Sequence, residues 1–249
     1  MEICMKTFEI IKGTDYGCWS NLPVDLIKED SVVYCFGAGE DLCYEFLLNG
    51  LTSSEIHIFD PTPRSKPHFD FCCDLVGKED DPPYNPAFGG GDVNYTKYIR
   101  ESKADVERMF FHDYGIYDED TEIEFYHPQN EDHVSMSIDN LQGTDRFTVL
   151  KVMKIDSIMK SLDHDRVDAL KLNIEGAEVA SLMYMMKETD VRPKLISVKF
   201  ELVRDKYSEE TVKLQNELGN LLLSEYTLLH RDGDNCTFIL GDINEDHKL

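Results

Sequence analysis

The stretch that decides the fold is Val32-Val33-Tyr34-Cys35-Phe36-Gly37-Ala38-Gly39-Glu40-Asp41. It begins as an apolar run, passes through a glycine turn and continues into a segment with helical character. In open α/β sheets, ligands bind outside the carboxyl ends of the strands, and a turn of this kind lets the backbone approach a ligand closely. The stretch therefore predicts a buried strand, a ligand-binding turn and a helix, with a purely structural turn as the alternative.

The next apolar run strengthens this interpretation. It reads Ile56-His57-Ile58-Phe59 and ends at Asp60 and Pro61. A carboxylate at the end of the second strand can accept hydrogen bonds from both hydroxyls of a ribose. Together the two strand ends predict a site for a cofactor that contains a nucleoside.

Short apolar runs alternate with longer amphipathic ones along the chain, which is typical of an α/β domain with a largely parallel sheet. We expect one domain over residues 1–249. The predicted strands are Ser31–Phe36, Glu55–Phe59, Arg108–His112, Ala169–Ile174 and Leu195–Glu201, with extra strands at Glu122–Tyr126 and Val149–Lys154. The predicted helices are Asp41–Leu48, ending at Asn49-Gly50, then Glu178–Met186, and one capped by Ser208. An Asp-Gly step between Tyr226–His230 and Asn235–Leu240 predicts an antiparallel hairpin at the end of the sheet.

Two regions interrupt the alternation. Residues 65–105 are predicted to be an insertion loop, because Lys78–Gly91 is rich in proline and ends in three consecutive glycines. Residues 1–30 form an N-terminal segment in which Tyr16, Gly17 and Trp19 are candidates for a lid over the site. The alternative for these aromatic residues is an anchor that packs the segment on the core.

Charge and cysteine usage exclude several classes of function. The chain has 25 Lys and Arg against 49 Asp and Glu, a formal net charge of −24. A field of that sign repels phosphodiester backbones and anionic lipid headgroups, so we expect no nucleic-acid partner and no membrane partner.

The first residues lack the basic and apolar regions of a secretion signal, which predicts a cytoplasmic protein. The 7 cysteines form no CxxC pair and lie mostly in apolar runs, so we expect reduced core thiols and no structural zinc held by them.

The acids at the glycine turn favour one class of cofactor. A dinucleotide fingerprint needs a third glycine and a helix N-terminus that faces a pyrophosphate anion. Here Leu42 occupies the third position, and Glu40 and Asp41 place negative charge near that anion. S-adenosylmethionine instead carries a cationic sulfonium, an ammonium group and an adenosine for Asp60. The sequence therefore favours S-adenosylmethionine over NAD.

Five motifs follow one another along the chain. They are GAGED at Gly37–Asp41, FDPTPRS at Phe59–Ser65, HPQNEDHVSMS at His127–Ser137, LKLNIEGAE at Leu170–Glu178 and ISVKFEL at Ile196–Leu202. In this order the chain resembles the FkbM-type S-adenosylmethionine-dependent methyltransferases, from about Tyr16 to Phe238. The resemblance implies a Rossmann-like class I methyltransferase fold: a seven-stranded, mostly parallel sheet with an antiparallel C-terminal hairpin strand and helices on both faces. It also implies transfer of a methyl group to a hydroxyl of a sugar or a polyketide.

The resemblance further implies which residues hold the cofactor. The glycine turn would approach it, with Glu40 and Asp41 near its methionine end, Asp60 at the ribose and residues 113–115 beside the adenine. The implied cofactor-binding residues are Gly37, Ala38, Gly39, Glu40, Asp41, Asp60, Pro61, Thr62, Asp113, Tyr114, Gly115 and Asn173. Two positions depart from the family pattern: Cys35 stands where many members carry an acid, and Asn173 stands where the family motif has an aspartate.

A hydroxyl is a poor nucleophile and needs a general base or a metal to remove its proton. Glu175, just past the fourth parallel strand, is the first candidate, Glu201 the second and His133 the third. Asn173 could orient the acceptor, and a divalent metal held by Asn173, Glu175 and Glu201 is a less favoured alternative. We expect structural roles for Glu178, at a helix start, and for His127.

These observations predict an S-adenosylmethionine-dependent O-methyltransferase that acts on a hydroxyl of a sugar or glycan. Its partner would be a small-molecule or glycan acceptor. Three alternatives stay open: O-methylation of another small molecule, an NAD-dependent oxidoreductase, and a methyltransferase-like binding module without turnover.

Overall fold

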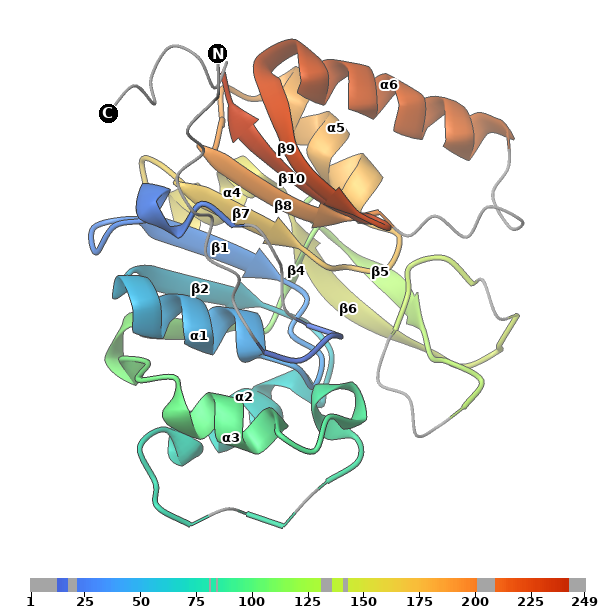
Figure 1. Ribbon diagram of the computed structural model, residues 1–249. Helices are drawn as coiled ribbons and strands as arrows, with labels where there is room; N and C mark the ends of the chain where they lie inside the picture. Colours follow the sequence, from blue (N-terminus) through green and yellow to red (C-terminus); the bar gives the residue numbers. More distant parts are fainter. Residues whose placement is uncertain are drawn as a thin grey trace.

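The main sheet has seven strands in the order β3-β2-β1-β7-β8-β10-β9 (Figure 1). The computed structural model describes residues 13–17, 22–80, 82–83, 85–130, 136–140, 143–200 and 209–241. The strands of the main sheet are β1 (Val32–Phe36), β2 (Glu55–Phe59), β3 (Met109–His112), β7 (Ala169–Leu172), β8 (Leu195–Lys199), β9 (Tyr226–Asp232) and β10 (Asn235–Leu240). The first five are parallel, whereas β10 runs antiparallel to both β8 and β9.

This strand order is that of the Rossmann-like class I methyltransferase fold, so the predicted fold class is confirmed. The chain moves outward from β1 to β3 and then returns to place β7 on the other side of β1. The order therefore reverses between β1 and β7, which is where open α/β sheets bind ligands. The two predicted extra strands are also present as β5 (Thr121–Tyr126) and β6 (Phe147–Met153). Together with β4 (Gly115–Ile116), which was not predicted, they form a second sheet.

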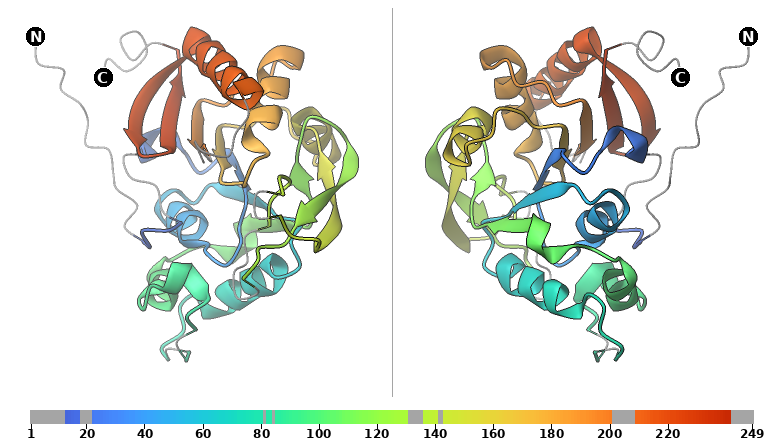
Figure 2. Two further views of the ribbon diagram at one scale, coloured as in Figure 1. Left: turned by 90° about the vertical axis from the view of Figure 1, so that its right-hand side faces the viewer. Right: turned by 90° about the vertical axis from the view of Figure 1, so that its left-hand side faces the viewer.

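Helices cover both faces of the main sheet (Figure 2). One layer contains α1 (Cys43–Thr52), α2 (Ser65–Leu75) and α3 (Tyr95–Glu101), and the other contains α4 (Ile155–Ser161), α5 (Glu178–Glu188) and α6 (Glu209–Glu225). Successive strand residues point to opposite faces, so Val33 and Cys35 contact the first layer while Tyr34 and Phe36 contact the second. Among the described helices, none combines the length and the apolar character that a membrane crossing requires.

The predicted stop of the first helix is wrong, because α1 continues through Asn49 and Gly50 to Thr52. The Asn49 side chain connects two segments: its amide donates to the Ser54 carbonyl at 2.8 Å, and its oxygen accepts from the Asp105 N–H at 2.6 Å. Gly50 lies against the backbone of Ser102, whose carbonyl oxygen is 1.8 Å from the position a Cβ would take. The close packing against Ser102 therefore explains why position 50 is a glycine.

The predicted insertion loop over 65–105 is also wrong in its extent, because α2 and α3 occupy its two ends. Phe69, Cys72 and Leu75 recur at helical spacing and bury one face of α2 in the core. The two helices are joined through His68, whose Nε2 lies 2.6 Å from the hydroxyl of Tyr95. The described residues between α2 and a short 3₁₀ helix at Phe88–Gly91 form no helix or strand, so the longest irregular stretch coincides with the proline-containing part.

A buried ion pair joins the first helix layer to the sheet. The Nζ of Lys171 on β7 lies 2.6 Å from Oε1 of Glu45 on α1, and the two side chains are 1% and 0% exposed. Lys171 is the neighbour of Cys35 in the parallel ladder between β1 and β7. The carboxylate beside Lys171 is therefore supplied by the helix, because Cys35 on the neighbouring strand carries none. The five cysteines that the structure describes are free, and four of them are buried, as expected for core thiols.

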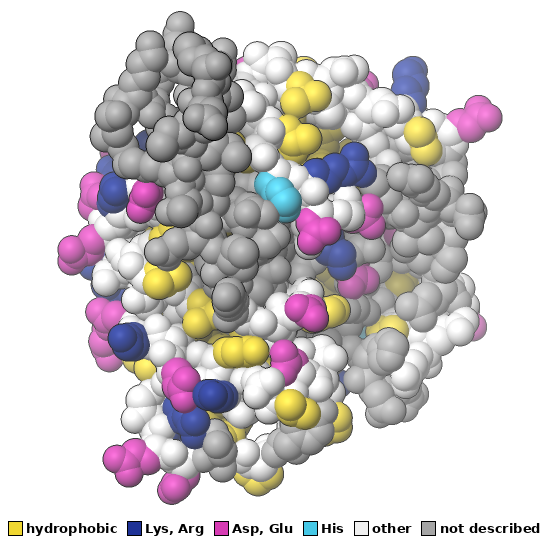
Figure 3. Space-filling view, viewed as in Figure 1, with side chains coloured by type: hydrophobic (Ala, Val, Ile, Leu, Met, Phe, Trp, Pro, Cys, Tyr) yellow, Lys and Arg dark blue, Asp and Glu magenta, His cyan; other side chains and the backbone are white. Residues whose placement is uncertain are grey.

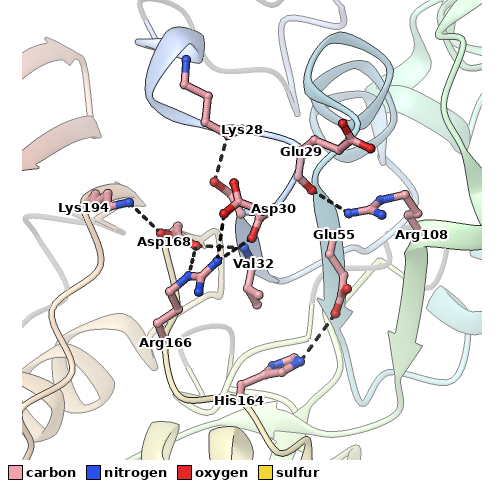
Figure 4. A network of polar contacts seen from close by, with 11 residues as sticks. Lys28, Glu29, Asp30, Val32, Glu55, Arg108, His164, Arg166, Asp168 and Lys194 are labelled. Atoms are coloured by element: carbon pink, nitrogen blue, oxygen red, sulfur yellow. Dashed lines mark hydrogen bonds and ion pairs between the residues drawn. The ribbon is translucent and has the colours of Figure 1, made fainter.

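The acidic side chains do not gather in one patch on the face seen in Figure 3. At the amino-terminal edge of the main sheet, Asp168 accepts hydrogen bonds from Val32 N, Arg166 Nε and Lys194 Nζ at 3.0, 3.1 and 2.9 Å (Figure 4). Burial alone would raise the pKa of Asp168, but these hydrogen bonds lower it overall. Asp168 therefore has a structural role: it connects the start of β1 to residues just before β7 and β8.

The close approach of β1 and β7 predicts a severe effect of Gly37→Ala. Gly37 has φ 86°, and a Cβ there would lie 2.0 Å from the carbonyl oxygen of Asn173. We expect a loss of about 3 kcal/mol or more in the free energy of unfolding, measured by denaturant titration. Gly77→Ala is the matched control, because Gly77 has φ 73° with nothing within 4 Å. It should cost only about 1 kcal/mol, and equal losses in the two variants would contradict the steric explanation.

Candidate functional site

A pocket lies at the carboxyl ends of β1, β2 and β7, where the strand order reverses. The glycine turn after β1, the segment Phe59–Thr62 and the residues after β7 form one side of it. Phe125, Met136 and Ile138 form an apolar wall on the side of the small sheet. The fold thus brings together the strand ends that the sequence predicted as a ligand site.

Most of the predicted site residues line this pocket. They are Gly37, Ala38, Gly39, Asp41, Asp60, Pro61, Thr62, Gly115, Asn173 and Glu175. They come from four separate parts of the sequence, so their convergence is a property of the sheet. Tyr16 and Gly17, the lid candidates, also line the pocket, whereas Trp19 is outside the described residues.

Three predicted cofactor residues are not part of the pocket lining. Glu40 points away from the pocket, because its two carboxylate oxygens accept from Arg64 Nε and Nη2 at 2.9 and 2.8 Å. Asp113 is exposed, and the Tyr114 ring packs against the rings of Phe59 and His112. Adjacent residues of a turn or an extended segment point in different directions, and a sequence motif does not show which of them faces the ligand. The catalytic candidates Glu201 and His133 lie outside the described residues.

Asp60 holds the glycine turn in place. Its Oδ2 accepts from the N–H groups of Ala38 and Gly39, both at 2.8 Å. Its Oδ1 accepts from the N–H and the hydroxyl of Thr62 at 2.8 and 2.6 Å. A carboxylate has about four acceptor positions, and these four bonds use them. The predicted bonds to a ribose would therefore have to replace bonds that now shape the turn.

Most of the backbone donors around the turn are already bonded. Gly37 N donates to the Phe59 carbonyl at 3.0 Å, and Leu42 N donates to the Tyr95 hydroxyl at 3.1 Å. Cys43 N, at the start of α1, donates to Oδ1 of Asp41 at 3.0 Å. A dinucleotide site offers such N–H groups to a pyrophosphate. Here protein acceptors occupy them, which disfavours an anionic ligand at this turn.

Asp41 supplies a buried carboxylate to the pocket wall, with 4% of the residue exposed. It accepts a hydrogen bond from the Thr14 hydroxyl in addition to that from Cys43 N. Burial raises the pKa of Asp41, although both hydrogen bonds oppose the shift. The chain at Gly17 packs directly over it, because a Cβ there would lie 2.4 Å from Asp41 Cγ. A carboxylate in this setting is best satisfied by a cationic group.

The segment after β7 provides the two remaining polar groups. Asn173 N donates to the Phe36 carbonyl at 3.0 Å, which fixes the segment beside the glycine turn. The Ser137 hydroxyl donates to the backbone carbonyl of Glu175 at 2.8 Å. Glu178 accepts from Gly176 N at 3.0 Å and is 1% exposed, so it supports the start of α5 as expected. Asn173 and Glu175 are thus polar residues of the pocket lining on this side.

No protein-family model matches the sequence, and no curated protein matches it significantly. Among solved structures, the chain is similar to the methyltransferase FkbM from Methylobacillus flagellatus, with 15% identity and a TM-score of 0.45. The match covers 86% of this chain and 44% of that one, so the chain spans less than half of the Methylobacillus protein. It is also similar to the fibrillarin pre-rRNA processing protein of Methanococcus jannaschii, with 9% identity, a TM-score of 0.39, and 88% and 69% coverage. Both likenesses concern the fold.

The apolar wall was missed by the sequence analysis. Phe125 belongs to β5, where the alternation with Ile123 would have indicated a shared face. Met136 and Ile138 lie in a segment without regular periodicity, and only tertiary contacts bring them to the pocket.

The four bonds of Asp60 predict that Asp60→Asn destabilises the fold. An amide nitrogen would meet backbone donors in place of an acceptor, which should cost about 2–4 kcal/mol in the free energy of unfolding. Thr62→Val removes the hydroxyl, which bonds to Asp60 and Ser65, but leaves the three bonds from backbone N–H groups, so it should cost only about 1 kcal/mol. If Asp60→Asn left denaturant stability unchanged, the structural role of this carboxylate would be refuted.

Proposed function

We propose that this protein is an S-adenosylmethionine-dependent methyltransferase that acts on a hydroxyl of a sugar or glycan. The observation that carries the proposal is the pocket at the reversal of strand order, with buried Asp41 in its wall and with the N–H groups of Ala38, Gly39 and Cys43 already bonded. Such a site favours a cationic ligand over a phosphate. The class I fold and the motif resemblance support the same activity, and the sugar acceptor is proposed from the resemblance alone.

The donor set of the pocket fits this cofactor. Asp41 would bind the ammonium group, the glycine turn would lie beside the methionine moiety, and Thr62 and Gly115 would contact the nucleoside. Phe59 and Ile116 also line the pocket and offer apolar surface to an adenine ring. When bound, S-adenosylmethionine supplies a methyl group attached to a cationic sulfur.

The residues of the chain would remove the proton of the acceptor, orient the acceptor and exclude water. Glu175 would accept the proton of the acceptor hydroxyl, and Asn173 would orient the acceptor. Tyr16 and the apolar wall would exclude water, so that alignment of the acceptor contributes to the rate. A divalent metal bound by Asn173 and Glu175 is the less favoured form of the proposal, and Glu201, its third proposed ligand, lies outside the described residues.

The alternative activities are weaker proposals. An NAD-dependent oxidoreductase would need donors for a pyrophosphate, and the N–H groups of Ala38, Gly39 and Cys43 already have acceptors. Another small-molecule acceptor, or binding without turnover, is distinguished by experiment. We propose a cytoplasmic protein that acts on a small molecule or glycan. The net charge of −24 supports the further proposal that it binds neither nucleic acid nor membrane.

Calorimetry with S-adenosylhomocysteine and with NAD tests the cofactor. We expect binding of the first compound and no binding of the second, and the reverse result would refute the proposal. A panel of sugars, nucleotide sugars and glycans with methyl-labelled S-adenosylmethionine then tests the acceptor. A second panel of small molecules that carry hydroxyl groups but no sugar is run beside it. Label on one of these molecules would retain the methyltransferase and replace the sugar, whereas cofactor binding without label on any acceptor would favour the binding module.

Two adjacent acids allow a matched test of the cofactor site. Asp41→Asn removes the charge that faces the pocket, and we expect S-adenosylhomocysteine affinity to fall about 10- to 100-fold. Glu40→Gln removes a charge directed at Arg64 outside the pocket and should change affinity less than about threefold. Calorimetry on both variants measures the difference, and equal losses would contradict the assigned orientation of these side chains.

A further inference from the structure

A second cluster of ligating side chains lies at the opposite end of β2 from the pocket. Glu55 is the first residue of β2, and His57 follows two positions later on the same face of the strand. His164 reaches them from the connection between α4 and β7. One ligand atom from each residue lies within 4.8 Å of the other two. Figure 4 shows Glu55 and His164 pointing toward each other.

We propose that Glu55, His57 and His164 form a binding site for a divalent transition-metal ion of the zinc type. Two imidazoles and one carboxylate are a common ligand set for zinc. Oε1 of Glu55 lies 2.8 Å from His57 Nε2 and 3.5 Å from His164 Nε2. Tetrahedral zinc with bonds of about 2.0–2.1 Å separates its ligand atoms by about 3.3 Å. The three side chains therefore need only small shifts to enclose the ion.

The hydrogen bonds behind the two histidines support coordination through Nε2. The Nδ1 of His164 lies 2.6 Å from the Tyr34 hydroxyl, and the Nδ1 of His57 lies 2.9 Å from Nε2 of His112. With a metal on Nε2, each Nδ1–H donates to that neighbour. Such a partner on the second ring nitrogen orients the ligand and sets its tautomer, as in most histidine metal sites.

The burial of the three side chains and the access to them from solvent also fit a metal site. The His57 and His164 side chains are 6% and 15% exposed, whereas the Glu55 side chain is 34% exposed and offers an entry path. Three protein ligands leave a fourth position for water or another ligand. The ion would connect β2 to the residues before β7, on either side of β1. It would therefore stabilise the main sheet at the edge that does not carry the pocket.

Zinc titration of the full chain, in competition with a chromophoric chelator, tests the site. We expect one equivalent to bind at micromolar concentration or tighter, with at least tenfold weaker binding by Glu55→Gln and by His164→Gln. Glu55→Gln keeps a group that can hydrogen-bond to His57, so the fold should persist, and circular dichroism checks this. His127→Gln is the matched control outside the cluster and should bind zinc as the parent does.

Two further measurements make the outcome decisive. Cobalt in place of zinc should give the intense visible absorption of a tetrahedral site, and Tyr34→Phe should weaken zinc binding about tenfold by removing the partner of His164. Zinc should also raise the melting temperature of the parent but not of Glu55→Gln. Absence of zinc binding, or binding that Glu55→Gln and His164→Gln leave unchanged, would overturn the proposal.

Discussion

The candidate site depends on the hydrogen bonds that the carboxylate of Asp60 accepts. It accepts two bonds from the glycine turn after β1 and two from Thr62, so it joins the ends of two neighbouring strands. The turn can pass this closely only because Gly37 has no side chain to meet the Asn173 carbonyl. One buried anion thus sets the shape of the turn, uses its N–H groups and leaves a pocket that does not favour anions.

Position in the fold divides the acidic residues into two classes. Asp168 at the amino-terminal edge and Glu45 in the helix layer are each paired with cations of the protein. Asp41 at the carboxyl edge is instead bonded directly to a hydroxyl and an N–H group, and the charge of Lys171, which also acts on Asp41, is paired directly with Glu45. The net charge of the chain gives no hint of this difference, because it depends on which acids have a cationic neighbour.

The strands could be predicted because short apolar runs rarely form any other kind of element. The limits of β2 and β10 agree with those expected. The hairpin followed from its Asp-Gly step. The helices of 65–105 were missed, since proline and glycine in the middle of the segment obscured the periodicity of α2. Gly50 was misinterpreted because a close contact and a helix stop both select glycine. Glu40 and Asp41 have similar local patterns, so the sequence could not show that only Asp41 lines the pocket.

By itself the sequence determined the fold class and the strand ends that line the pocket, because periodicity and turn residues are local properties. The chemical type of ligand stays a prediction drawn from charge. Only the tertiary structure decided which acids face the pocket, that Asp60 is already bonded, and that Glu55, His57 and His164 converge. These facts depend on contacts between segments distant in the chain. His164 lies more than a hundred residues from His57, and only the pairing of β1 with both β2 and β7 brings the two together.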